Sequence, residues 1–372
     1  MSTFIELGVR KDYIKALKEL NIKIPTEIQE KTIPVLLESP KDFIGLAQTG
    51  TGKTAAFGLP ILHQIDDKKD EVQALILAPT RELVQQIKKQ LFKFTKYTNT
   101  KIFVEAVFGG EKIDIQMRNL KRTTHVVVAT PGRLLDLIEK GSVNIKNIKT
   151  LVLDEADEML SMGFKEDLNK ILSYTKGTRH TWLFSATMPE GVLRIINNYM
   201  AENAPKIEVN KDALVNANIS HKYIITSIVN KPITLYKLLD SRPDERGIIF
   251  CRTKAGTQSL TTALKHEGYS VGALEGDMQQ KDRDKVMRTF KNESLQILVS
   301  TDVSARGIDV SDLAFIVHHQ LPEHLEYYTH RSGRTARAGK TGESIALILP
   351  NEIQRINEIE KELGIKFKEI VV

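Results

Sequence analysis

One octapeptide constrains this chain more than any other segment: Ala47-Gln48-Thr49-Gly50-Thr51-Gly52-Lys53-Thr54. It follows an apolar run at 42–46 and precedes 55–65, where apolar residues recur at helical spacing. A strand, a Gly-rich turn and a helix in this order form a phosphate cradle, because backbone N–H groups and the helix N-terminus point at the anion. Lys53 would then reach the β- and γ-phosphates, and the Thr54 hydroxyl would ligate Mg²⁺. The usual pattern opens on Gly rather than Ala, yet the segment still predicts a site for a nucleoside triphosphate.

Apolar runs rich in Ile, Val and Leu alternate with helical patterns along the whole chain. The runs are 43–47, 74–78, 102–107, 125–129, 150–153, 182–184, 223–226, 247–251, 270–274, 296–300, 315–318 and 344–349. Continuous apolar runs are typical of parallel strands that are buried on both faces and joined by crossover helices. We therefore predict an α/β fold with mostly parallel sheets.

The pattern is interrupted once, at 208–220, where polar and small residues carry no strong period. A chain of 372 residues suits two domains. We therefore predict an N-terminal domain at 1–210, a linker at 211–220 and a C-terminal domain at 221–372.

Composition narrows the class of protein. The net charge of +6 favours a nucleic-acid partner only weakly. No run reaches membrane-spanning length, residues 1–20 lack a signal-peptide core, and the histidines show no zinc-ligand spacing. The single cysteine, Cys251, excludes an internal disulfide and is expected to be a buried, inert thiol. These features predict a cytoplasmic protein.

Paired acids follow the apolar run at 150–153. Asp154 would hold Mg²⁺, partly through water, because this ion keeps several waters and prefers carboxylates. Glu155 would orient or deprotonate the attacking water. The alternative is that both acids only cap the following helix. With the phosphate loop, the pair predicts nucleotide hydrolysis.

The four residues Asp154-Glu155-Ala156-Asp157 are the tetrapeptide after which the DEAD-box RNA helicases are named, and the chain resembles that family over nearly its full length. Further motifs follow in the family's order: Phe4, Asn21-Ile22-Lys23-Ile24-Pro25-Thr26-Glu27-Ile28-Gln29, Pro79-Thr80-Arg81-Glu82-Leu83, Gly109-Gly110, Thr130-Pro131-Gly132-Arg133, Ser185-Ala186-Thr187, Ile249-Phe250-Cys251-Arg252-Thr253, Gln280-Lys281-Asp282-Arg283, Thr301-Asp302-Val303-Ser304-Ala305-Arg306-Gly307-Ile308-Asp309 and His330-Arg331-Ser332-Gly333-Arg334-Thr335-Ala336-Arg337. Asn21-Ile22 replaces the usual Gly-Phe, and Ser332 and Ala336 replace Ile and Gly. The resemblance implies two tandem RecA-like domains, each a mostly parallel sheet flanked by helices.

ATP with Mg²⁺ is the nucleotide that the resemblance implies. The Gln29 amide can pair with adenine N6 and N7, whereas guanine presents acceptors at O6 and N7, so ATP should be preferred over GTP. Phe4 would stack on the base. The alternatives are an exposed helix residue for Gln29 and a core anchor for Phe4. The expected nucleotide-binding residues are Phe4, Pro25, Thr26, Gln29, Gln48, Thr49, Gly50, Thr51, Gly52, Lys53, Thr54 and Asp309.

The catalytic residues implied by the resemblance are divided between the two domains. Lys53 and Glu155 belong to the first, whereas Arg334 and Arg337, three apart on an expected helix face, would be arginine fingers from the second. Neither domain can then stabilise the transferring phosphoryl charge unless the two close together. Residues expected to couple hydrolysis to RNA binding are Asp157, Ser185, Thr187 and His330, for which structural polar contacts are the alternative.

The expected RNA groove consists of side chains that donate hydrogen bonds to phosphate and of glycines that let the RNA backbone approach closely. Such contacts bind the RNA backbone and do not recognise its base sequence. Its members are Thr80, Arg81, Gly109, Gly110, Thr130, Arg133, Arg252, Arg283 and Thr301. Aromatic residues are sparse in these motifs, which argues against a base-stacking platform. For each single arginine, a solvated basic surface is the alternative.

Three functions remain open from the sequence. The first is an ATP-dependent RNA helicase that acts as a monomer on single-stranded RNA and short duplexes. The second is an ATP-gated RNA clamp that serves assembly, and the third is a translocating DNA helicase, against which Gln29 and Asp157 argue. Family members often carry basic or RNA-binding tails, so the chain is either a minimal, bacterial-type member that relies on protein partners or a trimmed one.

Overall fold

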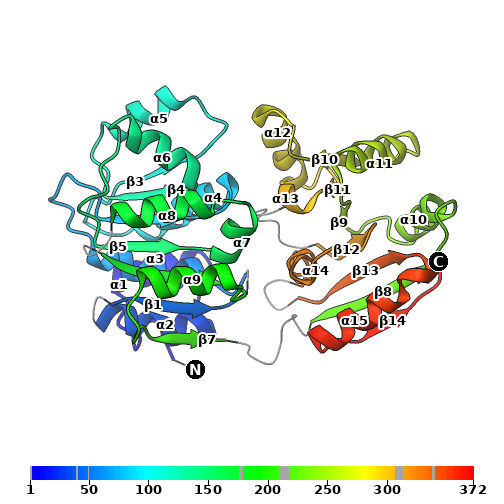
Figure 1. The fold of residues 1–372 in the computed structure, drawn as a ribbon, viewed down its shortest axis with the longest axis horizontal. Coiled ribbons are helices and arrows are strands. Elements are labelled where there is room, and N and C mark those ends of the chain that lie inside the picture. The colour runs from blue at the N-terminus through cyan, green and yellow to red at the C-terminus, as the bar shows by residue number, and fades with distance from the viewer. Residues whose placement is uncertain are drawn as a thin grey trace. The chain divides into compact units, whose positions relative to one another are not determined.

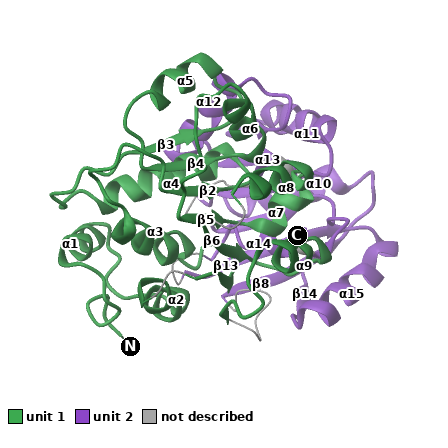
Figure 2. Ribbon diagram, turned by 60° about the vertical axis from the view of Figure 1, so that its left-hand side comes forward, with its two compact units in different colours: residues 1–209 green, residues 210–372 purple. Residues whose placement is uncertain are grey.

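The computed structural model describes residues 2–38, 41–48, 50–175, 179–209, 218–305, 313–336 and 340–372 (Figure 1). The chain divides into two compact units, 1–209 and 210–372, which are coloured separately in Figure 2. Each unit contains a seven-stranded sheet, and every strand pairing in both sheets is parallel.

The sheet of unit 1 has the strand order β3-β4-β2-β5-β6-β1-β7. Its strands are β1 (Phe43–Leu46), β2 (Ala74–Leu77), β3 (Val104–Val107), β4 (Val126–Ala129), β5 (Thr150–Leu153), β6 (His180–Ser185) and β7 (Lys206–Glu208). Its helices are α1 (Lys11–Glu19), α2 (Glu27–Glu38), α3 (Lys53–Gln64), α4 (Arg81–Phe94), α5 (Ile113–Leu120), α6 (Pro131–Glu139), α7 (Ala156–Ser161), α8 (Lys165–Tyr174) and α9 (Glu190–Tyr199).

Both faces of this sheet are covered, as the continuous apolar runs predict. Successive residues of one strand enter two different cores: Val126 and Val128 pack with α1 to α4, whereas Val127 and Ala129 pack with α6 to α9. This alternation follows from the two-residue period of a strand. The sheet is therefore the middle layer of a three-layer unit (Figure 1).

The sheet of unit 2 has the order β10-β11-β9-β12-β13-β8-β14. Its strands are β8 (Ile219–Ile225), β9 (Gly247–Phe250), β10 (Val271–Leu274), β11 (Ile297–Ser300), β12 (Phe315–His318), β13 (Gly342–Ile348) and β14 (Phe367–Glu369). Its helices are α10 (Lys231–Asp240), α11 (Lys254–His266), α12 (Gln280–Lys291), α13 (Asp302–Ala305), α14 (Leu325–Ser332) and α15 (Ile353–Leu363), with a 3₁₀ turn at Pro350–Glu352. One core packs α10 and α11 on the sheet, and two others pack α12 with α13 and α14 with α15.

Three details differ from the sequence predictions or refine them. The edge strands β7 and β14 were not predicted. The expected linker, 211–220, lies mostly outside the described residues, and its last two residues, Ile219 and Ser220, belong to β8.

Cys251 is buried, and burial raises the pKa of its thiol to about 12, as expected of an inert thiol. Within the described ranges, no helix is both long and apolar enough to cross a bilayer.

Candidate active site

The predicted site residues of unit 1 lie at or after the carboxyl ends of parallel strands, apart from Phe4 and the segment that carries Gln29. In sheet order, Gly109 follows β3, Thr130 follows β4, Thr80 follows β2, Asp154 follows β5, Ser185 ends β6 and the phosphate loop follows β1. Because these strands are parallel, all six segments lie at one edge of the sheet, which is where open α/β sheets bind ligands. The expected RNA contacts occupy one half of this edge, and the expected nucleotide contacts occupy the other half.

The phosphate loop has the backbone that its glycines predict. Gly50 and Gly52 have φ values of 81° and 93°, and Gly52 is the N-cap residue of α3. Left-handed backbone of this kind is readily adopted only by glycine. Lys53 is buried, and its Nζ donates to the Ala47 carbonyl at 3.1 Å. The ammonium therefore lies folded back across the loop, at the N-terminus of α3, where an anion is favoured.

Gln29 is attached to this loop and is not the exposed helix residue of the alternative interpretation. Its side chain is 2% exposed, its Oε1 accepts from the Thr26 N–H at 3.0 Å, and its Nε2 donates to the Gly52 carbonyl at 3.0 Å. A side-chain amide has two donor hydrogens and two acceptor lone pairs. One of each is used here, so one of each remains for a base. Phe4, by contrast, is 3% exposed within the hydrophobic core of unit 1, which favours the core-anchor alternative.

We expect Gly52→Ala to destabilise unit 1 by about 1–3 kcal/mol, because alanine would be held in a left-handed conformation. The added Cβ would also lie 2.3 Å from Gln29 Nε2, so the Gln29–Gly52 bond must break. Urea unfolding measures the effect. Gly109→Ala is the control, since a Cβ there meets no atom within 4 Å. Equal stability of both variants would contradict the geometry of the loop.

The acidic pair lies where β5 ends. Asp154 is 2% exposed, and its Oδ1 has no hydrogen-bond partner among the described residues. Burial raises the pKa of its carboxyl to about 7, although the charge of Lys53 opposes the shift. Glu155 has φ 53° and ψ 54°, an uncommon conformation for a residue other than glycine. Strained backbone of this kind is concentrated at active sites.

The site fits Mg²⁺ bound in the way that phosphoryl-transfer enzymes bind it. A buried carboxylate oxygen without a partner is costly unless a cation or a donor reaches it. Mg²⁺ usually takes one or two carboxylates and completes its shell with waters and substrate phosphates. Among the described residues, no group of three or more His, Cys, Asp or Glu side chains could hold a metal ion, and this mode of binding needs none. Asp154 and the Thr54 hydroxyl are the residues that would hold the ion.

Three of the expected coupling residues lie together. Asp157 Oδ2 accepts from both the backbone N–H and the hydroxyl of Thr187, each at 2.8 Å. The hydroxyl of Ser185 accepts from the Asp157 N–H at 3.3 Å and donates to the Thr187 carbonyl at 2.7 Å. Ser185-Ala186-Thr187 is therefore bonded directly to the acidic motif.

The expected RNA contacts of unit 1 are helix-start residues and an arginine that supports a loop. Thr80 is the N-cap residue of α4, where its hydroxyl accepts from the Leu83 N–H at 3.3 Å, and Thr130 is the N-cap residue of α6. Arg133 donates to the Glu111 carbonyl at 2.9 Å, immediately after Gly109-Gly110. A helix N-terminus attracts phosphate.

In unit 2, the expected RNA contacts differ in exposure. Arg252 is exposed, whereas Thr301 is buried. Arg283 is also buried, and it donates to the Ser304 carbonyl at 2.7 Å. Its guanidinium therefore ties α12 to α13.

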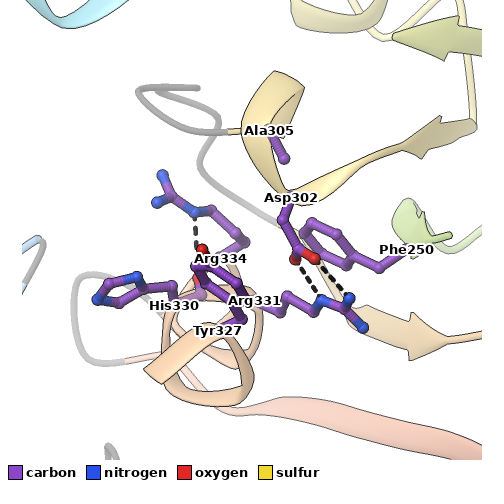
Figure 3. A pocket seen from close by; sticks show the side chains of 7 residues that line it. All are labelled: Phe250, Asp302, Ala305, Tyr327, His330, Arg331 and Arg334. Atoms are coloured by element: carbon purple, nitrogen blue, oxygen red, sulfur yellow. Dashed lines mark hydrogen bonds and ion pairs between the residues drawn. The ribbon is translucent and has the colours of Figure 1, made fainter. Parts of the chain in front are cut away.

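Arg334 does not lie on a helix as predicted. The helix α14 ends at Ser332, and Arg334 lies beyond that end. Arg334 is buried, and its Nε donates to the His330 carbonyl at 3.2 Å (Figure 3). Three expected residues, Thr49, Asp309 and Arg337, lie outside the described residues.

Sequence reasoning did not select Asp302 or Arg331, although both stand inside motifs that carry the resemblance. Arg331 is 1% exposed, and it forms a bidentate ion pair with Asp302. The sequence did indicate both residues, because Asp302 directly follows the predicted site residue Thr301, and Arg331 directly follows His330.

Comparison with known proteins gives the same assignment as the site. The family model for DEAD/DEAH box helicases matches residues 26–195, and the model for the helicase conserved C-terminal domain matches 230–339. The DEAD-box ATP-dependent RNA helicase CshA of Geobacillus kaustophilus is 43% identical over 97% of this chain and 76% of the relative. The chain belongs to the DEAD-box RNA helicase family.

Solved structures of DEAD-box proteins share the fold. Saccharomyces cerevisiae Dbp5 bound to RNA and ADP BeF3 is 30% identical, with a TM-score of 0.91 over 100% of this chain and 96% of the other. A DEAD box protein from Methanococcus jannaschii is 37% identical, with a TM-score of 0.57 over 99% of both chains. The predicted tandem RecA-like fold of this DEAD-box helicase is confirmed.

Proposed function

We propose that this DEAD-box helicase binds ATP, Mg²⁺ and single-stranded RNA, and separates short RNA duplexes as it hydrolyses ATP. One observation carries the proposal. The phosphate loop and Asp154 lie at the carboxyl ends of the strands, as do the proposed RNA contacts that follow β2, β3 and β4. The similar Dbp5 structure is bound to RNA and to ADP BeF3 together. Nucleotide and RNA sites on one rigid sheet can influence each other through the strands and loops that they share.

In the proposed reaction, unit 1 supplies most of the groups around the phosphates. The loop N–H groups and Lys53 bind the β- and γ-phosphates, and Glu155 orients the attacking water and accepts its proton. Mg²⁺, held by Thr54 and Asp154, would neutralise charge on the phosphate oxygens. Arg334 of unit 2 would stabilise the charge that develops on the transferred phosphoryl group. Because these groups belong to separate units, turnover requires the two units to close.

We propose that coupling to RNA passes through Asp157. This carboxylate holds Thr187 by two bonds, so a change in the acidic motif must shift Ser185-Ala186-Thr187 as well. His330 of unit 2 is the residue proposed to join this network when the units close. The proposed RNA contacts bind phosphate rather than base edges, so binding is independent of sequence. Action as a monomer in the cytoplasm completes the proposal.

Gln29 is expected to select adenine. Gln29→Ala should reduce the preference for ATP over GTP by about 5- to 150-fold, the range of a bidentate base contact worth about 1–3 kcal/mol. Competition of ATP and GTP for the free protein measures this preference. Glu27→Ala is the control, because Glu27 lies exposed on the same helix and pairs with Lys31 at the surface. An unchanged preference would exclude Gln29 from base recognition.

The helicase activity itself is tested by strand separation. We expect a short RNA duplex with a single-stranded extension to be separated with Mg·ATP, and a duplex of matched DNA to persist, because contact with the 2′-OH distinguishes the two. RNA held stably in the presence of ATP without separation would indicate the clamp. Separation of the DNA duplex at an equal rate would support the DNA helicase.

A further inference from the structure

Arg331 carries a buried charge that contacts several partners in unit 2. Its Nη2 donates to Asp302 Oδ2 at 2.7 Å, and its Nε donates to Oδ1 of the same carboxylate. Its Nη1 donates to the Gln320 carbonyl at 2.8 Å and reaches His318 Nδ1 at 3.3 Å. The guanidinium also lies 5.1 Å from the centre of the Phe250 ring. Elements β9, β12, α13 and α14 therefore meet around one side chain (Figure 3).

A buried ion pair of this kind is weak evidence for stability, because the cost of removing two charges from water offsets their attraction. A bidentate pair does, however, define the relative position of its two partners in both distance and angle. The adjacent cavity has a volume of about 10 Å³. Such a space holds roughly one water and no larger ligand. The residues around Arg331 therefore form a packed contact between β9, β12, α13 and α14 and not a ligand site.

A second network holds α14 against the sheet from the same side. Arginine has no acceptor, so His318 Nδ1 accepts from Arg331, and the proton of this ring is on Nε2, which donates to the Ser344 hydroxyl at 2.9 Å. Burial, and then the charge of Arg331, lowers the pKa of His318 well below 6.5, so the ring stays neutral. The Ser344 hydroxyl also lies 2.8 Å from that of Ser332 and 3.3 Å from that of Tyr328.

The Ser332 hydroxyl joins α14 to this second network through Ser344. The buried hydroxyl of Tyr328 lies 2.6 Å from His221 Nδ1, so the network extends to β8. Polar side chains thus fix both the rotation and the height of α14 on its sheet.

Each residue of the ion pair lies close in sequence to a residue with a proposed function: Asp302 to the RNA contact Thr301, and Arg331 to the arginine finger Arg334. Asp302 directly follows Thr301, the proposed RNA contact, and α13 is held further by the bond from Arg283 to Ser304. Arg331 directly follows His330 and precedes Arg334 by three residues. Figure 3 shows Arg331 extending toward Asp302, whereas His330 and Arg334 extend to the other side of α14.

We infer that Arg331 is a positioning residue, which through Asp302 makes the Thr301 segment and the arginine finger Arg334 move as one body. The inference rests on the proposed function, because Thr301 and Arg334 receive their roles there. RNA that displaces the Thr301 segment then displaces Arg334 by the same movement. In this way unit 2 couples RNA binding to the catalytic arginine without any contact between Arg331 and a ligand.

Two conservative variants and a matched control test the inference on the full chain. Arg331→Lys keeps the positive charge but cannot form the bidentate pair. Asp302→Asn keeps the shape of the side chain but loses its negative charge. The control is Arg246→Lys, because Arg246 lies 4.8 Å from the centre of the Phe290 ring and pairs with Glu293, yet precedes the amino end of β9. Circular dichroism and thermal unfolding identify conditions under which all variants are folded.

The first measurement is amide hydrogen exchange in the free protein. We expect exchange at 302–305 and 325–332 to accelerate together by about tenfold or more in both site variants and to stay unchanged in the control, as local opening becomes easier. The second is RNA-stimulated ATP hydrolysis, where kcat should fall by about tenfold or more, while KM for ATP changes little. The RNA concentration that gives half-maximal stimulation should rise as well.

Unchanged exchange in these two segments would overturn the inference, and so would a kcat equal to that of the parent protein. A lower unfolding temperature with normal kcat would make Arg331 merely structural, which also overturns it. If the parent protein hydrolyses no ATP with RNA, the proposed function fails, and the exchange measurement alone decides whether Arg331 joins the two segments.

Discussion

Glu155→Gln is expected to lower the turnover of ATP by about 10²- to 10⁴-fold, the usual contribution of a general base. The amide retains the shape of the side chain and the left-handed backbone at this position, but it cannot accept the proton of the attacking water. Binding of ATP and of RNA should persist, because neither depends on that proton transfer. Single-turnover hydrolysis, together with equilibrium binding of ATP and RNA, measures the two effects separately.

Glu158→Gln is the matched control for this prediction. Glu158 is buried one turn further along the same helix, and its carboxylate lies 3.3 Å from the Ser161 hydroxyl. Its loss should leave turnover close to that of the parent protein. Normal turnover in Glu155→Gln would exclude Glu155 as the base, and equal losses in both variants would attribute the effect to a general change of charge.

Arg334→Ala is expected to reduce kcat by about 10³- to 10⁵-fold, the range found for arginine fingers in phosphoryl transfer. The affinity for ATP should change far less, because the arginine belongs to unit 2 and acts on charge that develops only in the transition state. Steady-state kinetics with saturating RNA gives kcat, and binding to the free protein gives the affinity.

The half-buried Arg355 of α15 supplies the control, since it pairs with Glu358 on the same helix. Arg355→Ala should hydrolyse ATP normally. If Arg334→Ala weakens ATP binding as strongly as it slows turnover, Arg334 makes an ordinary ground-state contact and is no arginine finger.

The central strands of both sheets could be read from the sequence, because a strand buried on two faces needs a continuous apolar run. Two of them, β5 and β12, have the predicted bounds. The edge strands β7 and β14 could not be found in this way. Each has three residues, and their sequences, Lys-Ile-Glu and Phe-Lys-Glu, are mostly polar because one side of an edge strand faces solvent.

The motifs predicted the candidate site well where spacing along the chain determines the geometry. The phosphate loop and the acidic pair lie next to each other because β1 and β5 both flank β6 in one parallel sheet. The prediction that Arg334 lies on a helix was wrong, because α14 ends two residues before it.

The side-chain partners of single residues could not be predicted, because they depend on tertiary contacts. Gln29 bonds to Gly52, which is 23 residues away, and that bond buries a side chain that a sequence pattern could place equally well at the surface. Arg283, a predicted RNA contact, is buried, and its guanidinium bonds to the Ser304 carbonyl. Asp302 and Arg331 pair across 29 positions, which no local pattern could indicate.

The central claim, an ATPase coupled to RNA, is tested most directly by the steady-state rate of Mg·ATP hydrolysis. The rate should be measured for the protein alone, with single-stranded RNA, and with DNA of matched length and sequence. We predict strong stimulation by RNA and little by DNA. Equal rates in all three conditions would contradict the account, because the nucleotide half and the RNA half of the sheet edge would then act independently.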